Sequence, residues 1–218
     1  MKRFLPALII AVIGISIAYY MLSRPKTLKV YNPIDINPDL VDESLQKVDK
    51  YHRVGSFKLY DQDGNETTEN DFKGKIYVTD FFFVTCPTIC PKMTKQMDRV
   101  YQEYQDTPDI MFLSHTVMPE ADSVPVLKAY AEKLNVSPDK WKFVTGDKKQ
   151  IYNLARKTYF AAVTEGDGGK DDFIHTENFV LVDKEKRLRG FYDGTSQEDV
   201  DRLIKDISAL LYEYKNQE

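Results

Sequence analysis

Hydrophobic residues follow two alternating periods along the central part of the chain. Residues 76–83 and 110–114 form nearly continuous apolar runs, which are typical of strands buried on both faces. Residues 141–144 alternate between apolar and polar, which predicts a third strand. After each strand, apolar residues recur every three or four positions, as on one face of a helix, over residues 91–104, 124–134 and 148–156. The pattern therefore predicts three consecutive pairs of a strand and a helix.

Two hairpins flank this central region. Residues 52–60 and 65–68 enclose an Asp-Gly turn, in which glycine supplies the positive φ that a tight turn needs. Residues 179–183 and 187–192 surround three charged residues, which predicts a second hairpin at one side of the sheet. Strands that alternate with helices imply an α/β fold, so we expect a thioredoxin-like layout with a mixed central sheet and flanking helices. Ser196 is expected to cap the last helix.

The N-terminal stretch from Phe4 to Leu22 contains no charged residue. As a helix it would span about 28 Å, close to the roughly 30 Å of a bilayer core. A cleaved signal peptide is the alternative, because Ser16-Ile17-Ala18 offers a small-x-small site, but the apolar run is longer than is usual for signal peptides. We therefore expect residues 1–22 to form one N-terminal transmembrane helix, whose orientation the flanking basic residues leave open.

Residues 23–51 show no sustained apolar period and contain Pro25, Pro33 and Pro38. This composition predicts an extended tether. The tether would hold the folded domain, residues 52–218, away from the membrane surface. The chain is thus expected to consist of an anchor, a tether and one domain.

Charge and composition exclude several classes of protein. The chain has 218 residues, enough for one domain with an appendage, and its 34 acidic residues outnumber the 30 basic ones. Because the net charge is −4 and no long basic block occurs, nucleic acid is not an expected partner. Apolar residues at 42% and charged residues at 29% argue against a disordered chain or a many-helix transporter.

The only two cysteines, Cys86 and Cys90, lie where the first buried strand ends and the first helix begins. If the turn between them is helical, both sulfurs lie on one face, close enough to chelate one ion or to form a disulfide. Amide groups at the start of a helix favour negative charge, so at least one thiol should be acidic and reactive. Simple packing or an inert disulfide is the alternative, but this edge of an α/β sheet commonly binds ligands, which favours a functional dithiol.

Two thiolates underfill most metal sites, and the three histidines are candidates for a third ligand. His175 follows a glycine-rich stretch at residues 166–169, and a loop of this kind can bring an imidazole onto a metal. His115 follows the strand at residues 110–114 and is a second candidate ligand or proton donor, although a solvated histidine at a strand end is the commoner case. His52 is interpreted as a surface residue.

Together these segments resemble the Sco/SenC family of membrane-tethered, thioredoxin-fold copper proteins that assist the assembly of cytochrome c oxidase. The resemblance rests on Phe-Phe-Phe-Val-Thr-Cys-Pro-Thr-Ile-Cys-Pro at residues 81–91, on the later His175 and on the N-terminal anchor. It extends from about Val54 to Tyr214. The Cys-Pro-x-x-Cys-Pro motif with a downstream histidine is much more specific than a pair of cysteines alone.

The resemblance implies copper binding and copper delivery. Cys86, Cys90 and His175 would bind one copper ion per chain, since soft thiolates select Cu(I) and imidazole also accommodates Cu(II). The acceptor would be the dinuclear copper site of a cytochrome c oxidase subunit, and an upstream copper donor or thiol reductant is a further expected partner. The chain would be a single-pass protein of a bacterial inner membrane with its domain in the periplasm, although a mitochondrial inner membrane fits the same residues.

The chain departs from the family pattern at two places. Members often carry Asp within the cysteine motif and just before the histidine, where this chain has Thr88 and Ile174. Members also usually show Ser-Val-Asp-Pro after the second strand, where residues 114–120 here read Ser-His-Thr-Val-Met-Pro-Glu. These differences leave the three implied ligands in place, but we expect them to affect metal affinity and the redox potential of the cysteines. One hypothesis is that His115 compensates for a missing carboxylate.

Two enzymatic alternatives follow from the same cysteines. As a thiol–disulfide oxidoreductase, the Cys86/Cys90 couple would act on cysteines of the oxidase subunit or of other periplasmic proteins. His175 would be dispensable for that reaction and essential for holding copper. A peroxidase with Cys90 as resolving thiol leaves both His175 and the anchor unexplained. Copper delivery is therefore the favoured function.

Overall fold

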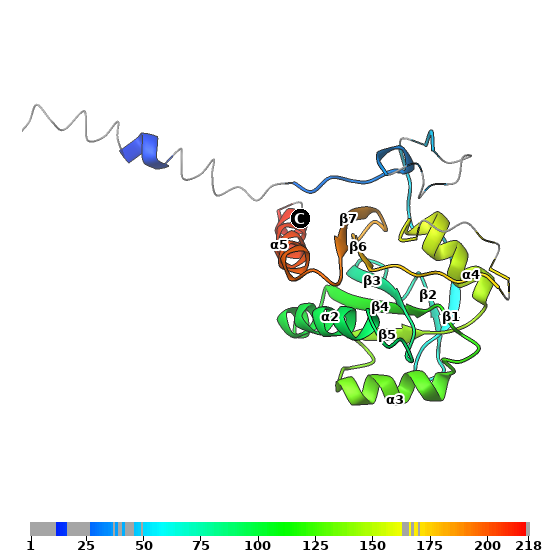
Figure 1. Ribbon diagram of the computed structural model, residues 1–218. Helices are drawn as coiled ribbons and strands as arrows, with labels where there is room; N and C mark the ends of the chain where they lie inside the picture. The colour runs from blue at the N-terminus through cyan, green and yellow to red at the C-terminus, as the bar shows by residue number, and fades with distance from the viewer. Residues whose placement is uncertain are drawn as a thin grey trace, which may run out of the picture.

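The computed structural model describes residues 12–16, 27–36, 38, 41, 46–48, 50–162, 166, 168, 169 and 171–216. Its centre is a sheet in the order β5-β4-β3-β6-β7, with a separate hairpin of β1 and β2 beside it (Figure 1). The strands are β1 (Lys58–Tyr60), β2 (Glu66–Thr68), β3 (Ile76–Phe82), β4 (Ile110–Thr116), β5 (Trp141–Val144), β6 (Asn178–Val182) and β7 (Leu188–Asp193). The helical elements are η1 (Pro33–Asp35), α2 (Cys90–Tyr104), α3 (Val124–Leu134), α4 (Lys148–Asn153), η3 (Leu154–Thr158) and α5 (Gln197–Lys215).

The central sheet is mixed, as the sequence predicts. β3, β4 and β5 are parallel, whereas β6 runs antiparallel to both β3 and β7. β3 lies in the middle, and all of its side chains are buried. This burial explains why residues 76–82 form an almost continuous apolar run, because a strand covered on both faces has no solvent-facing positions. The thioredoxin-like α/β layout is confirmed.

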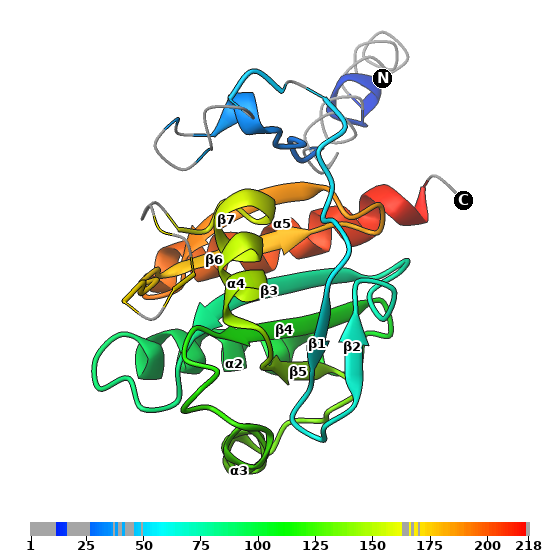
Figure 2. The same cartoon turned by 90° about the vertical axis from the view of Figure 1, so that its right-hand side faces the viewer.

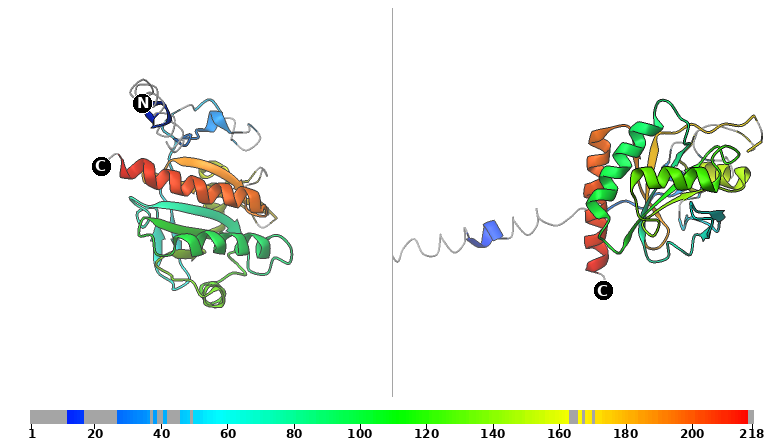
Figure 3. Two further views of the ribbon diagram at one scale, coloured as in Figure 1. Left: turned by 90° about the vertical axis from the view of Figure 1, so that its left-hand side faces the viewer. Right: turned by 90° about the horizontal axis from the view of Figure 1, so that it is seen from below.

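Helices cover both faces of the sheet and create two hydrophobic cores. α2 and α5 lie on one face (Figure 3, left), and α4 and the β1–β2 hairpin lie on the other (Figure 2). The first core contains Val78, Phe82, Cys90, Met93, Met97, Leu203 and Ile207. The second contains Phe57, Tyr77, Phe81, Leu113, Tyr152 and Tyr159. Alternate residues of β3 enter opposite cores, because successive side chains of a strand point to opposite faces.

The ends of the helices show where local signals hold and where tertiary contacts override them. The expected cap of α5 is present, since Ser196 Oγ accepts a hydrogen bond of 3.3 Å from the Asp199 amide. The helix predicted over residues 148–156 instead ends at Asn153 and continues as the π-helical segment η3. The wider π turn carries the chain to Tyr159, which is fully buried with its hydroxyl 3.1 Å from that of Tyr77.

The predicted membrane anchor is described only at residues 12–16, which are helical. Among the residues that the structure describes, no helix has the length and apolarity needed to cross a bilayer. The remainder of the predicted anchor lies outside the described residues.

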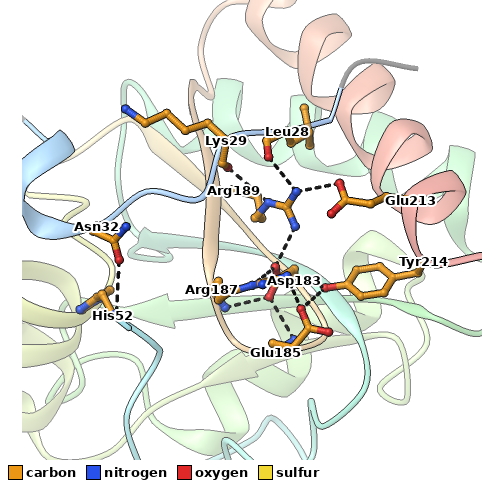
Figure 4. Close-up of polar contacts among 10 residues, drawn as sticks. All are labelled: Leu28, Lys29, Asn32, His52, Asp183, Glu185, Arg187, Arg189, Glu213 and Tyr214. Carbon is orange, nitrogen blue, oxygen red and sulfur yellow. Dashed lines mark hydrogen bonds and ion pairs between the residues drawn. The ribbon is translucent and has the colours of Figure 1, made fainter. Parts of the chain in front are cut away.

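Part of the predicted tether is packed onto the domain. The Tyr31 amide donates to the Leu188 carbonyl at 2.9 Å, which places Tyr31 beside the start of β7. Arg189 donates from Nη2 to the Leu28 carbonyl at 2.9 Å and from Nε to the Lys29 carbonyl at 3.3 Å (Figure 4). Residues 28–31 are therefore an added segment at the β7 edge of the sheet.

Candidate functional site

The two cysteines meet at the carboxyl end of β3, where the sequence places them. β3 ends at Phe82, and Cys90 is the first residue of α2. Both side chains lie beneath the surface, with 6% of Cys86 and 5% of Cys90 exposed, and both are free thiols. Pro87 and Thr88 between them are exposed. The pair thus lies just under an accessible turn.

Cys86 is the more acidic thiol. Burial by itself raises its pKa, but hydrogen bonds from the Cys90 and Thr88 backbone amides outweigh burial and bring the pKa of Cys86 down to about 7. The Cys90 amide lies 3.4 Å from Cys86 Sγ, and Thr88 Oγ1 lies 3.9 Å from it. Amides at the start of a helix stabilise a thiolate in this way. A large fraction of Cys86 is therefore ionised at neutral pH.

Cys90 has the opposite character. Burial raises the pKa of Cys90 to about 12, and the negative charges of Cys86 and Asp80 act in the same direction. Cys90 also belongs to the core formed by α2 and the sheet. Near neutral pH Cys86 is therefore partly ionised while Cys90 stays a thiol, which is the arrangement of a nucleophile with a second, resolving thiol.

A buried acid, Asp80, lies near Cys90 and was not predicted from the sequence. Asp80, in the middle of β3, accepts a hydrogen bond of 2.5 Å from Ser114 Oγ, which in turn accepts one of 2.9 Å from Trp141 Nε1. Burial raises the pKa of Asp80 to about 7. The available signal was a single carboxylate inside an otherwise apolar strand, because a buried charge in such a run requires a partner.

A second missed carboxylate supports the chain that leads to Cys86. Asp122 is buried, and its Oδ2 accepts hydrogen bonds from the Val84 amide at 3.1 Å and from Thr116 Oγ1 at 2.5 Å. These bonds tie the segment after β3 to the segment after β4. No sequence pattern distinguishes Asp122 from neighbouring polar residues.

His175 lies in the segment that precedes β6, and its side chain is exposed. The segment passes close to the cysteine turn, because the Phe173 ring packs edge-on against the Phe83 ring at a centroid distance of 5.6 Å. Within the described part of the chain, no three Cys, His, Asp or Glu side chains lie close enough together to hold a metal ion. The three-ligand set of Cys86, Cys90 and His175 therefore stays a prediction.

The other two histidines lie away from the cysteines. His115 is completely buried, so the interpretation as a solvated strand-end residue is wrong. Its ring stacks on Phe81 at 4.7 Å, which places it in the core on the opposite face of the sheet from Cys90. This position gives no support to His115 as a substitute ligand. His52 is half-buried, with Nε2 2.8 Å from the Thr158 carbonyl oxygen.

Comparison with known proteins gives relatives that are similar in sequence over most of this domain. Residues 46–212 match the family model described as SCO1/SenC. The SCO1 protein homolog of Bacillus subtilis is 31% identical over 160 residues, which cover 72% of this chain and 82% of that protein. Protein sco1 of Schizosaccharomyces pombe is 31% identical over 196 residues, which cover 86% of this chain and 69% of that protein.

Solved structures show the same fold. BsSco, described as a member of the Sco family of cytochrome c oxidase assembly proteins with a disulfide switch, aligns with a TM-score of 0.62 and 31% identity, covering 75% of this chain and 96% of BsSco. Yeast Sco1 with copper bound aligns with a TM-score of 0.55 and 26% identity, covering 73% of this chain and 95% of that protein. With the family model matching most of the domain, this chain belongs to the SCO1/SenC family.

Proposed function

We propose that this chain binds copper through Cys86, Cys90 and His175 and delivers it to the dinuclear copper site of a cytochrome c oxidase subunit. The observation that carries the proposal is the pair of adjacent thiols at the start of α2, one of which has a pKa of about 7. Metals bind the thiolate form of cysteine, and two soft sulfurs favour Cu(I) over harder ions. The copper-bound structure of the relative yeast Sco1 supports copper as the cargo.

His175 is the proposed third ligand. The edge contact between Phe173 and Phe83 keeps its segment near the cysteine turn. An exposed imidazole is available without displacing core residues, and imidazole accepts Cu(II) as well as Cu(I). Binding of one ion would involve all three residues.

The exposed tip of the site suits transfer to another protein. Pro87 and Thr88, which lie between the two cysteines in the chain, are open to solvent, and Thr88 Oγ1 is 3.9 Å from Cys86 Sγ. Incoming thiolates of an acceptor can therefore approach copper and replace the ligands of this chain one at a time. The relative BsSco is described as a cytochrome c oxidase assembly protein, which supports an oxidase subunit as the acceptor.

We also propose that residues 1–22 anchor the domain to a bacterial inner membrane, with the domain on the periplasmic side. The uncharged run from Phe4 to Leu22 supports an anchor. A copper donor or a thiol reductant would load or reset the site from the same side.

The test is a Cu(I) competition titration of the reduced full-length chain in detergent. We expect one tightly bound equivalent, and we expect Cys86→Ser, Cys90→Ser and His175→Ala each to weaken binding by at least about ten-fold. His52→Ala is the matched control, because His52 lies against Thr158 and Phe160 rather than near the cysteines. If His175→Ala binds copper as tightly as the parent, the three-ligand site is wrong.

The unequal thiols also support a second function, thiol–disulfide exchange. The Cys86 thiolate would attack an acceptor disulfide, forming a mixed disulfide and releasing one acceptor thiolate. Cys90 would then lose its proton and attack Cys86 Sγ, which releases the second acceptor thiolate and leaves Cys86 and Cys90 oxidised by two electrons. His175→Ala should keep the full rate of this exchange, whereas Cys86→Ser should abolish it. A stopped-flow assay of the exchange rate with the aryl disulfide dithiobis(nitrobenzoate) separates the two functions.

A further inference from the structure

The segment that carries His175 alternates between buried and exposed residues. Ile174 is 1% exposed and Thr176 is 6% exposed, whereas Phe173 and His175 face solvent. Thr176 Oγ1 also donates to the Ala161 carbonyl at 2.5 Å. The backbone of the segment is therefore held to the domain at every second residue, and His175 lies on the outer face together with Phe173.

The start of this segment is held by an ion pair with two parallel hydrogen bonds. Arg156 Nη1 and Nη2 donate to Asp172 Oδ2 and Oδ1, each at 2.7 Å. Only 12% of the Arg156 side chain and 7% of the Asp172 side chain are exposed. A planar guanidinium that binds both carboxylate oxygens fixes direction as well as distance.

Further contacts fix the same carboxylate and backbone. The Gly168 amide donates to Asp172 Oδ2 at 2.7 Å, and the Tyr152 hydroxyl lies 3.3 Å from the Asp172 carbonyl oxygen and 2.9 Å from that of Val117. A Cβ atom at Gly166 would collide with the Asp172 carboxylate, so the glycine-rich stretch is needed for this close approach. Asp172 is thus enclosed by partners on several sides.

Arg156 reaches Asp172 from η3, the π-helical segment after α4. Its guanidinium also lies over the Tyr152 ring, 5.4 Å from the centroid. Holding a long side chain in one position costs conformational entropy, and removing two charges from water costs solvation energy. These costs are offset only because the bonds to Arg156 hold the Asp172 carboxylate in one position. Asp172 lies three residues before His175.

We propose that the Arg156–Asp172 pair is the positioning element of His175. The pair fixes the backbone of residues 172–176 beside the cysteine turn, so that the imidazole is prepared to join Cys86 and Cys90 on copper. This inference rests on the proposed copper site and adds residues that act through His175 without touching the metal. Loss of the pair keeps all three ligands in the chain but increases the conformational freedom of residues 172–176. Copper binding must then also order this backbone, and the entropy cost of ordering weakens copper affinity.

The test combines two measurements on the full-length chain in detergent. Hydrogen–deuterium exchange of the metal-free form reports the freedom of the segment, and Cu(I) competition reports affinity. The variants are Asp172→Asn, which keeps shape but removes charge, and Arg156→Lys, which keeps charge but cannot form two parallel bonds. Lys142→Gln is the matched control, because Lys142 pairs with the buried Asp61 at 2.8 Å on the far edge of the sheet.

In Asp172→Asn, we expect the amides of residues 173–176 to exchange about ten-fold faster, and in Lys142→Gln we expect no change there. Copper affinity should fall roughly ten-fold in Asp172→Asn and by less in Arg156→Lys. In a His175→Ala background, Asp172→Asn should cause no further loss, because a residue that acts through His175 has nothing left to position.

Two results would overturn the inference. One is unchanged exchange at residues 173–176 in Asp172→Asn; the other is an equal loss of affinity with and without His175. If Asp172→Asn does not fold, Gly166→Ala disturbs the same carboxylate while keeping its charge, and the same two readouts apply. A His175→Ala variant with parental copper affinity would refute the proposed ligand set instead, and the exchange data would still decide whether the pair holds the segment.

Discussion

Arg189 of β7 and Asp183, which follows β6, form an ion pair in which Nη1 and Oδ2 are 2.9 Å apart and neither side chain is more than 1% exposed. Arg189 also donates to Glu213 of α5 at 2.8 Å and to the carbonyls of Leu28 and Lys29 (Figure 4). One side chain therefore joins the N-terminal segment, the β6–β7 hairpin and the C-terminal helix. A buried guanidinium requires such a complete set of acceptors, because an unpaired buried charge is costly.

Arg189→Gln should lower the free energy of unfolding by roughly 3 kcal/mol, since it removes the buried partner of Asp183. It should also expose the chain near Lys29 to trypsin, because the Leu28 and Lys29 carbonyls lose their donor. Arg187→Gln is the control: Arg187 pairs with the same Asp183, and its other side-chain bonds go to Glu185 and Tyr214. Urea titration and limited proteolysis measure both effects. Equal cleavage near Lys29 in the two variants would contradict a role for Arg189 in holding this segment.

The cysteines should differ sharply in alkylation. In the reduced, metal-free chain, iodoacetamide should modify Cys86 first, with a rate that rises through about pH 7, because the Cys86 thiolate forms there. Cys90 should stay unmodified at that pH, since its pKa is about 12. Peptide mass spectrometry at a series of pH values identifies the modified residue. Preferential modification of Cys90 at neutral pH would show that the acidic thiol has been assigned to the wrong residue.

Asp80 should destabilise the fold as the pH rises. Its pKa is about 7 in the folded chain, against an ordinary value of 3.8 for an aspartate, so between these limits the unfolded chain binds fewer protons than the folded one. Stability from this group is complete below pH 3.8 and is lost as the pH rises to about 7. The difference in unfolding free energy between the parent and Asp80→Asn should therefore shrink or reverse across this window in urea titrations. A constant difference would mean that Asp80 titrates normally.

His115 should destabilise the fold as the pH falls. Burial lowers its pKa from 6.5 to about 3, and its Nε2 has no hydrogen-bond partner within the described residues. Between these two values the unfolded chain binds more protons than the folded one, so stability is complete above pH 6.5 and is lost toward pH 3. His115→Phe should remove this acid sensitivity, with the aromatic stack on Phe81 retained. Parallel pH profiles for the parent and His115→Phe would refute the prediction.

The sequence alone determined the order of the elements and the place of the cysteines. A nearly continuous apolar run indicates a strand covered on both faces, and residues 76–82 of the run predicted over 76–83 form the central strand β3. The helical period over residues 124–134 gave α3 with the same limits. Cys86 and Cys90 lie at the junction between β3 and α2, because the apolar run ends before them and the helical period begins after them.

Only the tertiary structure decided which distant polar residues meet. Ser114 of β4 donates a hydrogen bond to Asp80 of the neighbouring strand β3. Arg156 of η3 pairs with Asp172, which precedes β6. Arg189 of β7 donates to the carbonyl of Leu28, near the other end of the chain. Periodicity tells which face a side chain occupies, but it carries no information about which residue of another element lies opposite it.

The burial of His115 has the same origin. The sequence places it just after a strand at residues 110–114, where solvent is the usual environment, whereas β4 continues to Thr116. Phe57 and Tyr159 come from segments far apart in the sequence, and both of their rings pack near His115 on that face of the sheet. Local sequence patterns thus determined the secondary structure and the placement of Cys86 and Cys90. The packing of distant segments determined the pKa values of buried groups and the polar contacts that support the site, because both depend on what surrounds a group in space.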